Sequence, residues 1–127
     1  GRSHFEQVPG EWEMPRLMAE FADNPHVRYW HDFGHIQRKH NLLLLNHDQY
    51  LRELKPHLYG AHVNDVQWPS RDHRAPFQGG CVDFDHLLPA YFTQRMPLTW
   101  ELSSSVTTEA ILEAKQRWDK LVASLPE

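Results

Sequence analysis

Short apolar and aromatic runs alternate along this chain with segments of helical period. Four of the runs are rich in aromatic or β-branched residues and are bounded by turn formers, a pattern typical of β-strands. These predicted strands cover residues 3–8, 26–33, 58–65 and 98–103.

Each predicted strand is followed by apolar residues at helical spacing. The clearest stripe runs from Ala110 to Leu125 behind Thr107, a residue suited to an N-cap. In the segment 84–92, Pro89 would kink a helix or reduce it to one turn. The remaining helices are expected from about Pro15 to Ala22 and after a cap at Asn46 or Asp48.

This order of elements repeats a strand and a helix four times. Such alternation predicts an α/β fold with a parallel sheet and right-handed crossovers. The chain contains no low-complexity segment and no interdomain linker, so we expect one domain over residues 1–127.

The composition of the chain limits the classes of protein to which it can belong. At 127 residues and 40% apolar content, the chain can form a packed core. Its net charge of −4, with no long basic run, argues against partners such as nucleic acid and anionic membranes. A single cysteine excludes an internal disulfide, and no apolar run reaches the roughly 20 residues that span a bilayer. We therefore expect a soluble, cytoplasmic protein that binds small molecules or protein.

Each predicted strand carries a metal-competent or acid-base side chain at its carboxyl end. These side chains belong to Glu6, Asp32, His62 and Glu101. The carboxyl ends of parallel strands share one face of the fold, so the four residues should converge. Three converging carboxylates would repel one another without a cation, and a divalent ion such as Mn²⁺, Co²⁺, Mg²⁺ or Zn²⁺ suits the mixed oxygen and nitrogen donors.

The ten histidines of the chain do not by themselves indicate a site. Several lie among polar or turn-like residues, where a solvated imidazole is the expected state. These are His4, His40, His47 and His86.

Five motifs resemble the second half of the xylose isomerase-like TIM barrels, a family of sugar epimerases, inosose isomerases and dehydratases, and enzymes that cut abasic DNA. The motifs are HFEQVP, HDFGH, GAHVNDV, RDHRAPFQGGCVDF and WELS, in the family's order and approximate spacing. The resemblance implies a parallel (βα)4 half-barrel corresponding to strands 5–8.

The same resemblance implies the roles of individual residues. Glu6, Asp32, His62 and Glu101 would be the metal ligands, and His35 would face the substrate from the next turn. The implied activity is that of a metal-dependent isomerase or epimerase for a ketose or inosose. Glu6 and Glu101 would exchange protons as base and acid on either side of an enediolate, with His62 as a neutral ligand.

The sequence also departs from the family pattern. Gln78 replaces the first glycine of the substrate loop, although Gly80 is present. Trp68 stands where an arginine is expected, so Arg71 or Arg74 would have to substitute for it; we take Trp68 and Arg71 as candidate substrate-binding residues. Asp72 and His73 resemble extra metal ligands of the DNA-cutting relatives without their spacing, and a solvated loop is the more frequent state of such residues.

A half-barrel exposes unpaired strand edges and the inner face of its sheet. It should therefore be completed by a second copy of the chain or by a missing N-terminal half. Whether the protein is an enzyme stays open at this point. The alternative is a non-catalytic, metal-binding or oligomerising remnant of the barrel family, and the acidic charge balance weakens a third hypothesis, a nuclease for abasic sites.

Overall fold

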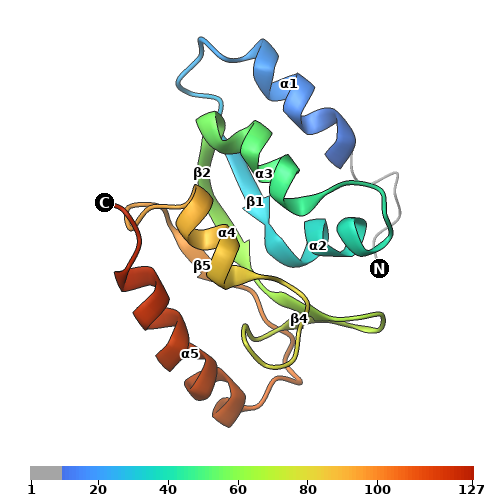
Figure 1. The fold of residues 1–127 in the computed structure, drawn as a ribbon, viewed down its shortest axis with the longest axis vertical. Coiled ribbons are helices and arrows are strands. Elements are labelled where there is room, and N and C mark those ends of the chain that lie inside the picture. Colours follow the sequence, from blue (N-terminus) through green and yellow to red (C-terminus); the bar gives the residue numbers. More distant parts are fainter. Residues whose placement is uncertain (1–9) are drawn as a thin grey trace.

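Three parallel strands form the main sheet of the protein (Figure 1). The structure is a computed structural model that describes residues 10–127. In the order β1-β2-β5, the strands are β1 (Tyr29–Asp32), β2 (Leu58–Val63) and β5 (Leu98–Trp100). The prediction of an α/β fold with a parallel sheet is confirmed for these strands, whereas the strand predicted at 3–8 lies outside the described residues.

Residues 10–127 also form five α-helices and two short 3-10 turns. The turns are η2 (Glu11–Glu13) and η3 (Lys55–His57). The helices are α1 (Met14–Glu20), α2 (Phe33–Asn41), α3 (His47–Leu54), α4 (Phe84–Tyr91) and α5 (Thr108–Ala123). None of them has both the length and the apolar character needed to span a bilayer.

The predicted helix caps are present. Asn46 accepts a hydrogen bond from the Gln49 backbone N–H, and Thr107 accepts one from Ala110. These side chains satisfy backbone donors that the first turn of a helix leaves unpaired. Pro89 does not reduce α4 to one turn, because α4 continues to Tyr91.

Three elements were not predicted from the sequence: the helix α2 and the two strands of a short hairpin. The strand predicted at 26–33 ends at Asp32, which caps the helix α2. The strand predicted at 58–65 ends at Val63, and β3 (Asp65–Gln67) then forms an antiparallel hairpin with β4 (Arg71–Arg74). Periodicity did not reveal the hairpin because its strands have only three and four residues.

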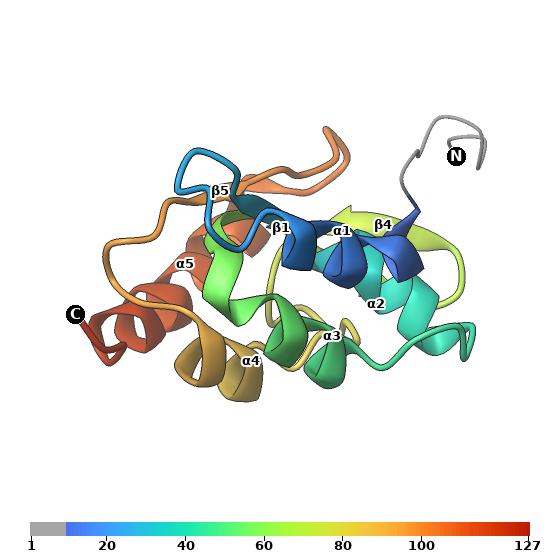
Figure 2. The same cartoon turned by 90° about the horizontal axis from the view of Figure 1, so that it is seen from above.

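The two faces of the main sheet have different surroundings. Figure 2 shows α3, α4 and α5 on one side of the sheet. Side chains alternate accordingly, so Tyr29 and His31 of β1 are buried while Trp30 and Asp32 reach the other face. On that second face, Trp30 and Tyr59 remain 37% and 54% exposed.

The core between sheet and helices contains a cluster of aromatic side chains. Phe33, Phe84 and Phe92 are almost completely buried, and the ring of Phe33 lies within contact distance of the other two. From α5, the ring of Trp118 packs edge-on against Phe84 and Trp100, with centroid distances of 5.4 and 5.6 Å. This packing holds β5 and α5 together.

Two glycines of the sequence motifs permit close approach of buried polar groups. A Cβ atom on Gly34 would lie 1.9 Å from Asn64 Oδ1, and one on Gly80 would lie 2.2 Å from Asp65 Cγ. The carboxylate of Asp65 accepts hydrogen bonds from the Val66 and Val82 backbone N–H groups. Asp65 therefore anchors the loop before α4 to the start of the β3–β4 hairpin.

A buried chain of hydrogen bonds links β1 to α2 and α3. The Tyr29 hydroxyl lies 2.8 Å from His31 Nδ1, and His31 Nε2 lies 2.9 Å from His47 Nε2. His47 Nδ1 lies 2.8 Å from Gln37 Oε1, while Gln37 Nε2 donates to Asn41. Because the amide oxygen of Gln37 only accepts, His47 carries its proton on Nδ1, His31 carries its proton on Nε2, and Tyr29 donates to His31.

The prediction that His47 is a solvated surface imidazole is wrong. The side chain is buried, and burial lowers the pKa of His47 to about 3. Burial, followed by the neighbouring His47, also lowers the pKa of His31 well below its usual value. Both rings are therefore neutral in the folded protein.

The two buried histidines make stability depend on pH. In the unfolded chain these histidines are exposed and bind protons below about pH 6.5, whereas in the folded protein they stay neutral. The free energy of unfolding should therefore fall as the pH decreases. Each ring contributes up to roughly 1.4 kcal/mol per pH unit. We expect His47→Gln to retain about half of the wild-type slope, because His31 remains.

Urea unfolding between about pH 7 and 5, in the presence of a chelator, measures this slope above the range in which most carboxylates titrate. His86→Gln, at an exposed histidine, is the control and should keep the full slope. An undiminished slope in His47→Gln would contradict the assignment of neutral buried rings.

Candidate metal centre

Three predicted site residues meet at the carboxyl ends of the three parallel strands. One side-chain donor atom from each of Asp32, His62 and Glu101 lies within 4.8 Å of the others. The strand register explains the meeting, since Asp32 pairs with His62 across β1 and β2, and Val63 pairs with Trp100 across β2 and β5. The predicted convergence is confirmed for these three residues, while Glu6 lies outside the described residues.

Asp32 has two separate tasks, one for each carboxylate oxygen. Oδ1 accepts a hydrogen bond of 2.9 Å from the His35 backbone N–H and so caps α2. Oδ2 is left to face His62 Nδ1 at 4.0 Å. The cap thus fixes the direction of the carboxylate and leaves one oxygen for the cluster.

His62 lies between the two carboxylates on the central strand of the sheet. Its Nδ1 atom is 3.2 Å from Glu101 Oε2, closer than it is to Asp32. The imidazole packs against Trp30 in a T-shaped arrangement, with ring centroids 5.4 Å apart. Trp30 therefore supports one side of the ring and limits its rotation.

Glu101 follows directly after β5 and is held there by its backbone. Its N–H group donates a hydrogen bond of 3.0 Å to the carbonyl oxygen of Val63. While Oε2 faces His62, Oε1 lies 3.4 Å from His73 Nε2. The carboxylate thus lies between two imidazoles.

His73 lies next to the site, although its sequence context did not indicate a firm role for it. The β3–β4 hairpin carries His73 to Glu101, and Asp72 Oδ1 lies 3.2 Å from the other ring nitrogen of His73, Nδ1. Both residues lie in the short strand β4 and not in a loop, and their side chains remain 47% and 42% exposed, so a site role for them stays a prediction. A turn at Pro69 and Ser70 was the available signal for the hairpin, but its strands are too short for a clear alternating pattern.

His35 contacts an acidic residue that sequence reasoning missed. The His35 ring on α2 makes an ion-pair contact through Nε2 with Oε1 of Glu11, whose carboxylate is buried in η2. The contact joins the start of α2 to the segment preceding α1. No periodic pattern distinguishes Glu11 from the neighbouring glutamate, Glu13.

The two candidate substrate-binding residues lie in the β3–β4 hairpin. Arg71 begins β4, and Trp68 precedes it between the strands, with both side chains exposed. Neither makes a hydrogen bond or ion pair with Asp32, His62 or Glu101 within residues 10–127. Their role in binding a substrate stays a prediction.

The donor atoms of the cluster suit a divalent cation. Carboxylate oxygens and an imidazole nitrogen bind such ions at about 2.0–2.2 Å. The separations of 3.2 and 4.0 Å from His62 Nδ1 to the two carboxylates are of the size found between ligands of one ion. All three side chains are about one third to one half exposed, so an ion could enter from solvent and keep water or substrate as further ligands.

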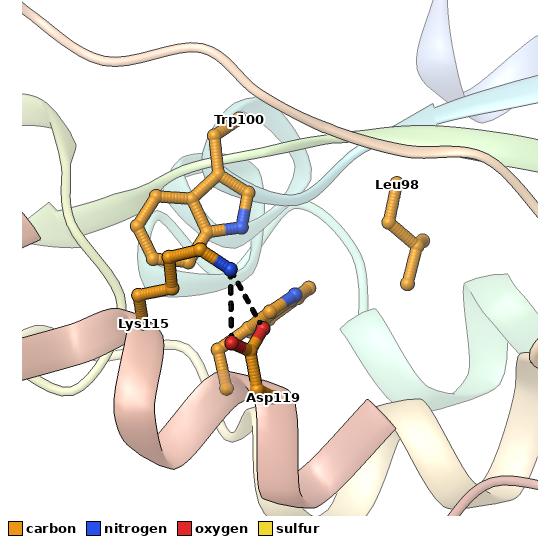
Figure 3. Close-up of a pocket in the computed structure, with 5 residues that line it drawn as sticks. Leu98, Trp100, Lys115 and Asp119 are labelled. Atoms are coloured by element: carbon orange, nitrogen blue, oxygen red, sulfur yellow. Dashed lines mark hydrogen bonds and ion pairs between the residues drawn. The ribbon is translucent and has the colours of Figure 1, made fainter. Parts of the chain in front are cut away.

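A separate pocket lies on the helical side of the sheet (Figure 3). It has a volume of about 230 Å³, and Leu98 and Trp100 of β5 and Trp118 of α5 line it with the Lys115–Asp119 ion pair. Because successive side chains of a strand point to opposite faces, the side chains of Trp100 and the adjacent Glu101 lie on different sides of the sheet. The pocket is therefore distinct from the cluster.

Comparisons of the chain with protein-family models, with curated proteins and with solved structures found no match.

The two tasks of Asp32 can be separated by mutation. Asp32→Ala removes the cap and should lower the free energy of unfolding by about 1 kcal/mol. Asp32→Asn keeps an oxygen that can accept the His35 N–H, so its stability should stay within a few tenths of a kcal/mol of the wild type, about the scale of differences among good caps. Chemical denaturation in chelator measures both values, and an equal loss in both variants would contradict the capping role.

Proposed function

We propose that the protein binds a divalent cation at Asp32, His62 and Glu101 and acts as a metal-dependent isomerase or epimerase on a ketose or inosose. The convergence of these three donors from adjacent parallel strands carries the proposal. The substrate class rests on the resemblance of the sequence motifs to the xylose isomerase-like barrels. Mn²⁺, Co²⁺, Mg²⁺ and Zn²⁺ are the candidate ions for this donor set.

The cation would polarise the substrate carbonyl and stabilise negative charge that develops on its oxygen. Glu101 would exchange a proton with the substrate, as the resemblance implies, and its exposed carboxylate supports this role. His62 binds and orients, because Trp30 supports its ring. The second proton-transfer group of the proposal is Glu6, which lies outside the described residues.

We also propose that the chain is half of a TIM barrel and is completed by a second copy or by an N-terminal half. The open face of the sheet supports this arrangement, since Trp30 and Tyr59 are exposed there beside the cluster. Within residues 10–127, β5 pairs with β2 alone and leaves one edge unpaired. A partner that covers this face would enclose the cation and restrict water around the substrate.

We also propose that the protein is located in the cytoplasm.

Metal binding is the first test. After incubation with Mn²⁺ and passage through a sizing column, the wild type should retain about one ion per chain, measured by elemental analysis. Asp32→Asn and His62→Ala should lose the ion, because each removes one of three donors. His86→Ala is the matched control, since His86 is also an exposed histidine paired with an aspartate, Asp48.

Retention of Mn²⁺ by His62→Ala would contradict the proposed centre. The same column reports the oligomeric state of the metal-loaded protein. Elution at twice the 15.0 kDa of one chain would favour completion by a second copy, and elution as a monomer would favour an absent half.

Activity tests the second part of the proposal. Ketoses and inososes should be screened with the metal-loaded protein, and Glu101→Gln should lower the rate about 10²–10⁴-fold because the amide cannot exchange the proton. Glu113→Gln on the exposed side of α5 is the control. An unchanged rate in Glu101→Gln would remove Glu101 from the mechanism, and a metal-loaded protein inactive on every sugar would favour the non-catalytic alternative.

A further inference from the structure

Three consecutive leucines between α2 and α3 are exposed to solvent. Leu42, Leu43 and Leu44, which we call the leucine turn, are 53%, 92% and 58% exposed. The next residue, Leu45, is half-buried and packs against the core. Packing within the protein therefore does not account for the leucine turn. Exposed apolar side chains that lie together are a mark of interaction surfaces.

The backbone holds the leucine turn in a strained conformation. The Leu43 N–H donates a hydrogen bond of 2.9 Å to the His40 carbonyl, and the Leu44 N–H donates one of 3.0 Å to the Lys39 carbonyl. These are the two bonds of a Schellman motif, which usually has glycine where Leu43 stands. The φ angle of Leu43 is 62°, in the left-handed region that disfavours a residue with a Cβ atom. Strain of this kind persists where the residue has a function outside the fold itself.

The tip of the β3–β4 hairpin lies on the same edge of the molecule as the leucine turn. Figures 1 and 2 both show the connection from α2 to α3 on the same side as the hairpin. An ion pair joins the two segments, since Arg38 Nη1 in the last turn of α2 lies 3.0 Å from Asp72 Oδ2 in β4. At the hairpin tip, Trp68 is 40% exposed and Arg71 is exposed as well. This edge therefore combines apolar, aromatic and cationic side chains.

The charge of this edge differs in sign from that of the whole chain. The net charge of −4 argued against an anionic membrane, but no acidic residue occurs between Phe33 and His47. Lys39 and Arg71 form no ion pair within residues 10–127. Asp72, which adjoins Arg71, is paired with Arg38. The local charge is therefore positive and complements an anionic surface.

A phospholipid surface matches each kind of side chain on this edge. Leucines on a protruding turn can enter the boundary between headgroups and acyl chains. Tryptophan is enriched at the level of the headgroups, where both parts of its ring system are satisfied. Lysine and arginine near the surface are attracted to anionic headgroups.

We propose that the leucine turn and the hairpin tip dock the protein on an anionic phospholipid surface. The leucines insert at the headgroup boundary, and Lys39 and Arg71 lie against the headgroups. Insertion of a few side chains gives weak and reversible attachment. The inference goes beyond the proposed function and needs neither a metal ion nor a substrate. It is compatible with a cytoplasmic location, because the cytoplasmic leaflet of a membrane is anionic.

Sedimentation with phospholipid vesicles tests the docking in metal-free protein with a chelator present. Vesicles of equal parts phosphatidylcholine and phosphatidylglycerol should carry the wild type into the pellet, and phosphatidylcholine alone should bind much less. Leu43→Gly should lower the partition coefficient about tenfold, because one apolar side chain no longer inserts. Leu112→Ala is the matched control and should bind as the wild type does, since Leu112 is 59% exposed on α5, outside this edge.

Leu43→Gly also separates docking from folding. Glycine suits the left-handed backbone at this position, so the midpoint of urea unfolding should not fall while vesicle binding does. Lys39→Ala should lower binding to the mixed vesicles about fivefold, because one cation near the surface is lost. Lys120→Ala, at an exposed lysine of α5, is its control and should bind normally.

Failure of the wild type to sediment with the mixed vesicles, or equal binding by Leu43→Gly, would overturn the proposal. Equal binding of the wild type to phosphatidylcholine alone would overturn the role of the positive charge. A wild type that is oligomeric on a sizing column, becomes monomeric in Leu43→Gly and binds no vesicles would assign the leucine turn to contact between copies instead. A protein that docks on vesicles but retains no Mn²⁺ would defeat the proposed function and support the docking.

Discussion

The parallel register of β1, β2 and β5 is the constraint on which the candidate site depends. It sets Asp32 opposite His62 and places Glu101 one residue beyond the last paired position of β5. Because side chains alternate between faces, a shift of one residue in any strand would turn its donor toward the helices. The aromatic core of Phe33, Phe84 and neighbouring rings opposes such a shift, since it would bring polar side chains into that core.

The helix α2 connects the parts of the site that lie off the sheet. Asp32 caps its start, His35 on its first turn meets Glu11, and Arg38 near its end holds Asp72. One short helix therefore links a proposed ligand, a proposed substrate-facing histidine and the hairpin that brings His73 to Glu101. The buried chain from Tyr29 through His31 and His47 ties α2 and α3 to β1 from the other side.

The sequence predicted the features that depend on local pattern and on the strand-end rule. The three strands, four of the helices and the meeting of Asp32, His62 and Glu101 follow from such patterns. Features that depend on tertiary contact could not be predicted in this way. His47 lies in a polar sequence but is buried because His31 and a glutamine satisfy both ring nitrogens, and His73 reaches the site only because a short hairpin folds over it.

The central claim is that one cation binds among the donors of three parallel strands. The most direct measurement is an anomalous difference map from crystals grown with Mn²⁺, recorded at wavelengths on both sides of the manganese absorption edge. The account predicts one peak about 2.0–2.2 Å from Asp32 Oδ2, His62 Nδ1 and a Glu101 oxygen. A peak elsewhere on the chain, or none at this position at saturating Mn²⁺, would contradict it.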